Sequence, residues 1–143
     1  MMQWNPYLSF NGKCEAAFKF YEKCLGGKIV AMVPYSEMPA SDKAECGEMP
    51  ASAMKMIMHA RLVAGSQILM GGDCPPGMPF DGVKGSSVAV QVDTPEEADK
   101  LFKALSENGN VTMPIAETFW ARRFGMLTDQ FGVPWMVNCE KPR

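Results

Sequence analysis

The sequence has little of what marks several large classes of protein. Its formal net charge is only −2, so it lacks the basic surface that nucleic-acid-binding and anionic-membrane-binding proteins need. It has no apolar run of membrane-spanning length, and its Met-Met-Gln-Trp start lacks the charged and apolar regions of a signal peptide. We therefore expect a cytoplasmic protein that has no nucleic-acid or membrane partner.

Paired cysteines and histidine are also scarce. The five cysteines are scattered and contain no Cys-x-x-Cys pair, which favours reduced thiols over a disulfide framework or a zinc site. The one histidine is His59. Methionine, by contrast, occurs thirteen times, and its adaptable side chain suits both irregular cores and permissive binding cavities.

The two halves of the chain show the same order of predicted elements. Hydrophobic periodicity in the first half predicts a strand, a helix and three strands at Trp4–Phe10, Lys13–Leu25, Lys28–Pro34, Met54–Leu62 and Gln67–Met70, with a long loop at Tyr35–Ser52. In the second half the same elements are expected at Ser87–Val92, Thr94–Asn108, Asn110–Ile115, Arg122–Thr128 and Pro134–Cys139. Similarity at a fixed spacing of about 80 residues indicates a duplicated unit.

Local signals mark the ends of the helices and the last turn. We expect Asn11 to cap the first helix and Gly26 to end it. Thr94-Pro95-Glu96-Glu97 combines a capping box with proline at the first helical position, which is a strong helix start. Asp129 to Gly132 is expected to form the turn of the last hairpin, and Trp135 to face the helix.

These elements predict an α+β fold of two βαβββ modules that form a curved mixed sheet around one cavity. Each helix would cover one face of its strands, leaving a more polar face that carries Asn5, Tyr7, Ser87, Ala89 and Gln91. The chain is expected to be a single domain over residues 1–143, with module one at 1–72, a linker at 73–85 and module two at 86–143.

Several stretches of this doubled plan are similar to the vicinal oxygen chelate superfamily, which includes glyoxalase I, bleomycin-resistance proteins and extradiol dioxygenases. Within it the chain resembles the PhnB-like branch, which is often labelled as a demethylubiquinone methyltransferase domain. The matching stretches are Pro6 to Gly12, Phe20-Tyr21, Glu37-Met38-Pro39, Glu117 to Ala121 and Thr128 to Asn138. By this resemblance we expect the glyoxalase-like fold and a homodimer.

Metal-dependent relatives hold their ion with His, Glu or Gln side chains from the first and last strands of each module. The resemblance puts Asn5, Met70, Ser87 and Met136 at those positions. Because they offer neither a carboxylate nor an imidazole, no metal is expected. Neither strand-to-helix turn is glycine-rich, so no nucleotide cofactor is expected and the methyltransferase label has no support.

The first function hypothesis is therefore a metal-free protein that binds an unknown small molecule. Its ligand would lie among Tyr7, Met70, Gln91, Trp120, Arg122 and Met136. A second hypothesis is an enzyme of lyase, isomerase or dioxygenase type, using a displaced metal site or the pair His59 and Glu117. A third hypothesis is an accessory protein whose cavity is filled by its own side chains. The sequence leaves open whether the protein is an enzyme.

Each candidate residue also has a structural interpretation. Glu117, Trp120 and Arg122 could bind an oxyanion and a flat ring, or Glu117 could pair with an arginine while Trp120 covers core or a dimer contact. His59 could be a base or a strand residue held by a hydrogen bond. We interpret Cys74 as a loop thiol rather than a nucleophile, and Asp129 as a turn former. Met54, Met56 and Met58 are expected to form one apolar face of a strand rather than a metal site.

Overall fold

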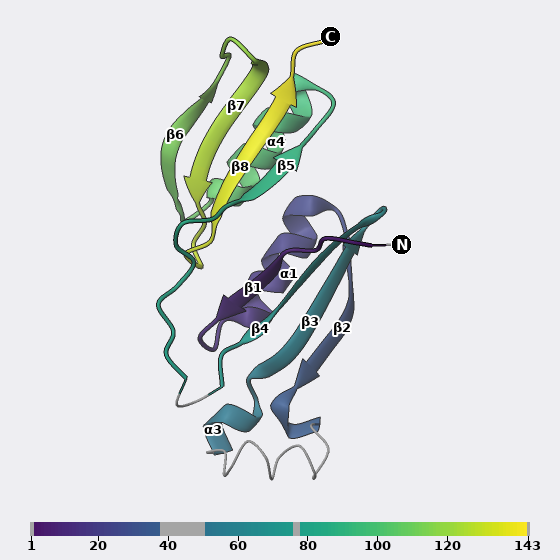
Figure 1. Ribbon diagram of the computed structural model, residues 1–143, viewed down its shortest axis with the longest axis vertical. Coiled ribbons are helices and arrows are strands. Elements are labelled where there is room, and N and C mark those ends of the chain that lie inside the picture. The colour runs from purple at the N-terminus through teal and green to yellow at the C-terminus, as the bar shows by residue number, and fades with distance from the viewer. Residues whose placement is uncertain (1, 38–50, 76–77, 143) are drawn as a thin grey trace. The chain divides into compact units, whose positions relative to one another are not determined.

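The computed structural model describes residues 2–37, 51–75 and 78–142, which fall into two compact units, Met1–Asp81 and Gly82–Arg143. Figure 1 shows that each unit contains one long helix and one sheet. Much of the predicted loop Tyr35–Ser52, with Cys46 and the Met38-Pro39 pair, lies outside the described residues.

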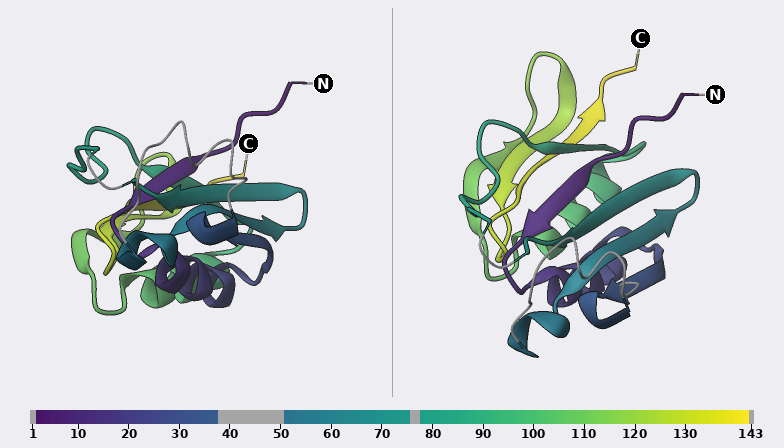
Figure 2. Two further views of the ribbon diagram at one scale, coloured as in Figure 1. Left: turned by 90° about the horizontal axis from the view of Figure 1, so that it is seen from below. Right: turned by 60° about the horizontal axis from the view of Figure 1, so that its bottom comes forward.

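The first unit has the predicted strand-helix-strand-strand-strand order. Its elements are β1 (Tyr7–Phe10), α1 (Cys14–Leu25), β2 (Lys28–Pro34), a short 3-10 turn η1 (Tyr35–Glu37), the one-turn α3 (Ala51–Met54), β3 (Ile57–Ala64) and β4 (Gln67–Asp73). The sheet order is β1-β4-β3-β2, with β1 parallel to β4 and the other pairs antiparallel. α1 packs across one face of this sheet, as Figures 1 and 2 show.

Alternation along the strands decides which side chains enter the core. Leu8 and Phe10 of β1 are buried beneath α1, whereas Tyr7 and Ser9 between them are exposed. Phe10 and Phe18 meet edge to face at 6.3 Å, and Phe18 also meets Tyr21. This face of the sheet is therefore an aromatic core, and the predicted half-buried strand is confirmed.

The start of α1 differs from the prediction. The residue at the N-cap is Lys13, which makes no side-chain cap, so Asn11 does not cap this helix. Instead the carboxylate of Asp73, at the end of β4, accepts hydrogen bonds from the backbone N–H groups of Gly12 and Cys14 at 2.8 and 3.0 Å. The helix ends as expected, because Gly26 takes a left-handed conformation with φ 72°.

The boundaries of β3 and β4 also differ from the prediction. Met54 belongs to α3 and β3 begins at Ile57, so Met54, Met56 and Met58 do not share one strand face. β4 continues beyond Met70 to Asp73. The carboxylate of Asp73 also accepts the N–H of Ile57 at 2.9 Å, and its carbonyl accepts the Tyr35 hydroxyl at 2.8 Å. These contacts hold the end of β4 as sheet.

The second unit repeats this order of elements, and the loop between its second and third strands is shorter than the corresponding loop of the first unit. Its elements are β5 (Val88–Gln91), α4 (Pro95–Ser106), β6 (Asn110–Ala116), β7 (Ala121–Thr128) and β8 (Pro134–Glu140), in the sheet order β5-β8-β7-β6. β5 runs parallel to β8 and the other pairs are antiparallel. α4 packs on one face of this sheet and buries Ala98, Leu101, Phe102 and Leu105.

Both local predictions for this unit are confirmed. Thr94 is the N-cap of α4, and its hydroxyl accepts the Glu97 N–H at 3.2 Å. Asp129 forms the hairpin turn by accepting the N–H groups of Phe131 and Val133 at 2.8 and 3.0 Å. Its second oxygen accepts the indole N–H of Trp135 at 2.8 Å, and Trp135 is 1% exposed. Trp135 is thus a core residue of this unit.

The predicted fold class is confirmed as an α+β fold of two βαβββ-like modules, each with a four-stranded mixed sheet. Among the described helices, none is long and apolar enough to cross a membrane. The single cavity shared by the two modules stays a prediction.

Candidate functional site

In each unit the long helix packs on one face of the sheet, and the opposite face of that sheet is called its open face. On the first sheet, two rows of side chains cross this open face. Tyr7 of β1, Met70 of β4 and Arg61 of β3 are in register and form one row. In the next row Ser9 is in register with Gly72. His59 lies beside Gly72, because Ala60 is in register with Gly71.

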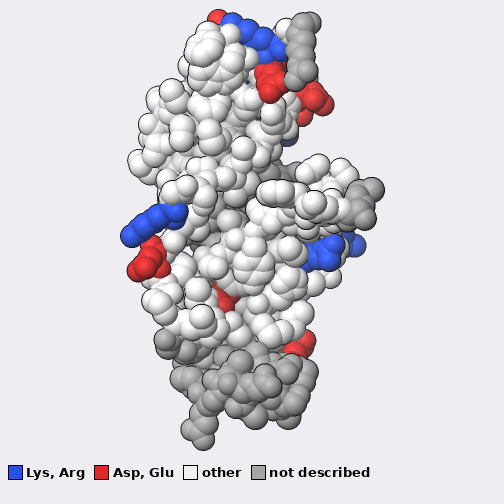
Figure 3. Space-filling view, in the orientation of Figure 1, with Lys and Arg blue, Asp and Glu red and all other residues white. Residues whose placement is uncertain are grey.

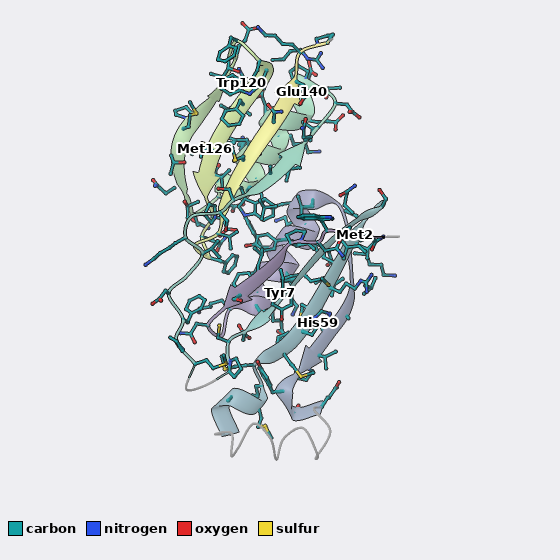
Figure 4. All side chains as sticks on the ribbon, viewed as in Figure 1. Met2, Tyr7, His59, Trp120, Met126 and Glu140 are labelled. Carbon is teal, nitrogen blue, oxygen red and sulfur yellow. The ribbon has the colours of Figure 1, made fainter. Side chains whose placement is uncertain are left out.

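Gly72 allows Tyr7 to lie across the sheet. A Cβ atom added at Gly72 would stand 2.7 Å from the Tyr7 hydroxyl and 2.5 Å from the carbonyl oxygen of Met58. Tyr7 therefore leans over Gly72 and stacks on His59, with ring centroids 6.3 Å apart and an interplanar angle of 22°. Figure 4 shows the two labelled side chains over the same face of the sheet. Gly71 does the same on the other face, where its missing Cβ admits the Phe18 ring.

Polar groups near the end of β4 affect ionisation at this place. Partial burial raises the pKa of Tyr7, and the thiols of Cys14 and Cys74 and the carboxylate of Asp73 raise it further. Burial, with the nearby Asp73 and Glu15 carboxylates, raises the pKa of Cys14 to about 12. Both groups therefore stay protonated at neutral pH, so Cys14 is not a nucleophile there.

The open face of the second sheet is richer in thioethers and aromatic rings. Met136 of β8 is in register with Met126 of β7, which is in register with Met113 of β6. Phe124 lies in the next row of β7 and meets Trp120 edge to face at 5.2 Å. Trp120 is 43% exposed and also meets Phe119, which is 88% exposed. Figure 4 shows Trp120 and Met126 on the side of the sheet away from α4.

A line of polar side chains borders these apolar groups. Asn138 of β8 donates to the amide oxygen of Gln91 at 3.3 Å, and Gln91 donates to the Glu140 carboxylate at 3.3 Å. The Oδ1 atom of Asn138 is buried and accepts no hydrogen bond from any described residue.

Arg122 and Glu117 already have protein partners. Arg122 donates to the backbone carbonyls of Glu140 at 3.2 Å and Asp93 at 2.7 Å. Glu117 lies 3.7 Å from Lys141, and its described ion pair is with this lysine and not with an arginine. The predicted cluster of Glu117, Trp120 and Arg122 is therefore held in part by contacts within the protein.

The structure assigns the sequence-based candidates to different units. Tyr7, Met70 and His59 share the open face of the first sheet, and Gln91 and Met136 share that of the second. Sequence analysis missed several residues on these faces, among them Arg61, Gly72, Phe124, Met126, Asn138 and Glu140. Strand alternation around His59 and Met136 could have placed Arg61 and Asn138, whereas the role of Gly72 needed the position of Tyr7.

Comparison with known proteins agrees with this architecture. The model of the Glyoxalase/Bleomycin resistance protein/Dioxygenase superfamily matches residues 4–137. The chain belongs to this superfamily. The family expected from the sequence is thereby confirmed.

Several members are similar over nearly their whole length. Protein YjdN from Escherichia coli K12 is 37% identical over 98% of this chain and 97% of its own. The crystal structure of protein PA1353 from Pseudomonas aeruginosa is 48% identical, covers 99% and 100% of the two chains, and has a TM-score of 0.88. A structure from Bacillus cereus, named as a PhnB protein and putative 3-demethylubiquinone-9 3-methyltransferase, is 27% identical over 96% and 99%, with a TM-score of 0.76.

The superfamily includes metal-dependent members, and the donor set here does not fit a hard divalent ion. Asn5 and Ser87 precede their strands and are exposed. Met70 is in register with Tyr7, and Met136 with Ala89. No carboxylate or imidazole stands at these places, and no three His, Cys, Asp or Glu side chains gather in the described parts of the chain.

Proposed function

We propose that this superfamily member binds a small organic molecule on the open faces of its sheets without the help of a metal ion. The observation that carries the proposal is that two of the four positions expected to hold metal ligands by the family resemblance are thioethers on the open faces. Met70 stands on one face and Met136 on the other, and Trp120 stands at the edge of the second. Such surfaces bind apolar groups without fixing one shape.

Polar groups on these faces would set the orientation of the ligand. Gln91, Asn138 and Glu140 form a hydrogen-bonded line beside Met136, and the Asn138 oxygen still needs a donor. An apolar wall with a few convergent polar groups is typical of small-molecule sites. Arg122 makes two side-chain hydrogen bonds to described residues and has five N–H donors, so its predicted ligand role stays part of the proposal.

Binding of Nile red, an uncharged apolar dye, tests the proposal. Trp120→Ala and Met136→Gln should each weaken binding by about threefold to tenfold, because each removes part of the apolar wall. Met78→Gln is the matched control, since Met78 is 62% exposed and lies outside both sheets. Equal affinity in all variants would overturn the proposed site.

The metal-independent part of the proposal needs its own experiment. Thermal melting should be repeated with Ni, Zn, Mn and Fe(II) on protein prepared without chelator or nickel affinity resin. A tight ion that binds only the folded state would add about 2.7 kcal/mol at a hundredfold excess over its dissociation constant. We expect no shift, and one bound metal per chain with a clear shift would contradict the proposal.

We also propose that the protein is a homodimer, as expected from the resemblance. Exposed apolar side chains on edge strands support this, namely Val30 of β2, 55% exposed, and Val111 and Met113 of β6, 42% and 43% exposed. Light scattering coupled to gel filtration should give a mass near twice the 15.7 kDa of one chain. A monomer mass at all concentrations would refute it.

A further inference from the structure

We propose that the open face of the first sheet binds the oxyanion head of a small organic acid, between Arg61 on one side and Tyr7 and His59 on the other. This inference rests on the proposed function, because it names the chemical class of ligand for one of the two faces. The ligand is a carboxylate or a phosphonate that carries an apolar chain.

The charges on this face are the first observation. His59 and Arg61 lie two residues apart on β3, so they share one face, and Arg61 is exposed. The described ion pairs are Lys19–Glu15, Arg123–Asp99 and Lys141–Glu117, none of which uses His59 or Arg61. Figure 3 shows mostly uncharged surface across this face, with basic side chains at the margin beside β3 and β2.

The arrangement of donors is the second observation. Arg61, Met70 and Tyr7 are in register on adjacent strands, and strands lie about 4.8 Å apart. An extended arginine therefore reaches a group held above Met70, and its planar fork matches a carboxylate or phosphonate. The Tyr7 hydroxyl and the His59 ring come together over Gly72 on the other side, and neither makes a hydrogen bond to another described residue.

Asp73 is the acidic group that bears on this position, and it explains where the anion would lie. Its carboxylate accepts N–H groups from Gly12, Cys14 and Ile57, so these donors largely compensate its charge. It lies on β4, three residues beyond Met70, and its carboxylate points to the helix face of the sheet, where it bonds Gly12 and Cys14 at the start of α1. An anion above Met70 lies on the opposite face, beside Arg61.

Titration calorimetry with three ligands of nearly equal chain length tests the inference. Octylphosphonate and the uncharged 1-octanol carry an octyl chain, octanoate carries a chain one carbon shorter, and the three differ mainly in the head group. We expect at least one acid to bind tenfold or more tightly than 1-octanol. Arg61→Gln should then weaken the acid by about tenfold to a hundredfold and leave 1-octanol unchanged, because it removes a charge-assisted pair of hydrogen bonds.

Two further variants separate the head-group contacts from folding. Tyr7→Phe removes only the hydroxyl and keeps the ring over Gly72, and it should weaken the acid by about threefold to tenfold. Lys23→Gln is the matched control, because it removes one exposed positive charge from α1 on the opposite face of the sheet. Thermal melts of all variants show whether each is folded.

The outcomes distinguish this inference from the proposed function. If 1-octanol binds as well as both acids, or Arg61→Gln weakens all three equally, the anion site is wrong and the apolar face remains. If neither the octyl ligands nor Nile red bind, the proposed function itself fails. Binding of octylphosphonate alone identifies a phosphoryl head, and binding of octanoate alone a carboxylate head.

Discussion

The two units share one plan but start their helices in different ways. α4 is capped from within its own sequence, by the Thr94 hydroxyl on the Glu97 N–H. α1 is capped by Asp73, whose carboxylate bonds Cys14 across 59 residues of chain. The same backbone need, acceptors for the first N–H groups of a helix, is thus met locally in one unit and by tertiary structure in the other.

The open faces of the two sheets also differ, in the chemistry of their side chains. The first carries Tyr7, His59 and Arg61 around Gly72, whereas the second carries Met126, Met136 and an aromatic edge. Because the helix side of each sheet holds the core, side chains on the open side can change without changing the fold. The doubled frame therefore gives two surfaces of different chemistry, one with a tyrosine, a histidine and an arginine and one rich in thioethers and aromatic rings.

Replacing Asp73 should produce the largest change. Asp73→Ala leaves the buried N–H groups of Cys14 and Ile57 and that of Gly12 without an acceptor, so we expect the free energy of unfolding to fall by about 3–5 kcal/mol. Chemical denaturation measures this. Asp81→Ala, an exposed aspartate in the same unit, is the control, and a cost no larger than that of a local helix cap would contradict the account.

Adding a methyl group at Gly71 or Gly72, on the two faces of the first sheet, should lower the free energy of unfolding somewhat less. Gly72→Ala places a Cβ 2.5 Å from a backbone oxygen and 2.7 Å from the Tyr7 hydroxyl, and Gly71→Ala meets the Phe18 ring at 2.8 Å. We expect each to destabilise the fold by about 1–3 kcal/mol. NMR of the aromatic rings should show His59 shifted only by Gly72→Ala. A neutral Gly72→Ala with an unchanged His59 signal would refute the proposed stacking.

The local cap of the second unit should matter less again. Thr94→Ala should lower the free energy of unfolding by about 1 kcal/mol, because only one helix N–H loses its acceptor. Thr94→Ser keeps the hydroxyl and should be close to neutral. If Thr94→Ala cost as much as Asp73→Ala in the same denaturation series, the contrast between the two units would fail.

Ionisation of Cys14 should leave the stability unchanged at neutral pH and act only in alkali. Its pKa is raised from 9.0 to about 12, so the folded protein keeps this proton where the unfolded chain loses it. Its contribution is therefore complete below pH 9 and is lost as the pH rises towards 12. Subtracting the pH profile of Cys14→Ala isolates this term. A difference that stays flat over that range would contradict the raised pKa.

The elements that sequence could predict are those whose causes are local. Thr94, Asp129 and Gly26 act on residues within one turn, and all three behave as the sequence indicated. The cap by Asp73 could not be predicted, because the carboxylate meets α1 only after β4 has paired with β1. Nor could the start of β3, since an apolar run of methionines fits a helix turn as well as a strand.

The candidate site was predictable to a similar degree. Strand alternation placed Tyr7 and Gln91 on the faces away from the helices, and the family resemblance added Met70 and Met136, which lie on the same faces. The partners of Arg122 could not be read from sequence, because they are backbone carbonyls of Asp93 and Glu140, remote in the chain. The stack of Tyr7 on His59 depends likewise on a missing side chain, that of Gly72 on a third strand.

The measurement that tests the central claim most directly is NMR of protein labelled with 13C at its methionine methyl groups. The methionines report from the open faces and from the core side of the first sheet. Met70, Met126 and Met136 lie on open faces, whereas Met32 lies in register with the core residue Ala60. Titration with octanoate and 1-octanol should shift the three open-face methyl signals and leave Met32 unchanged. Shifts confined to Met32 and other methionines away from the open faces, or no shift at all, would contradict binding on these faces.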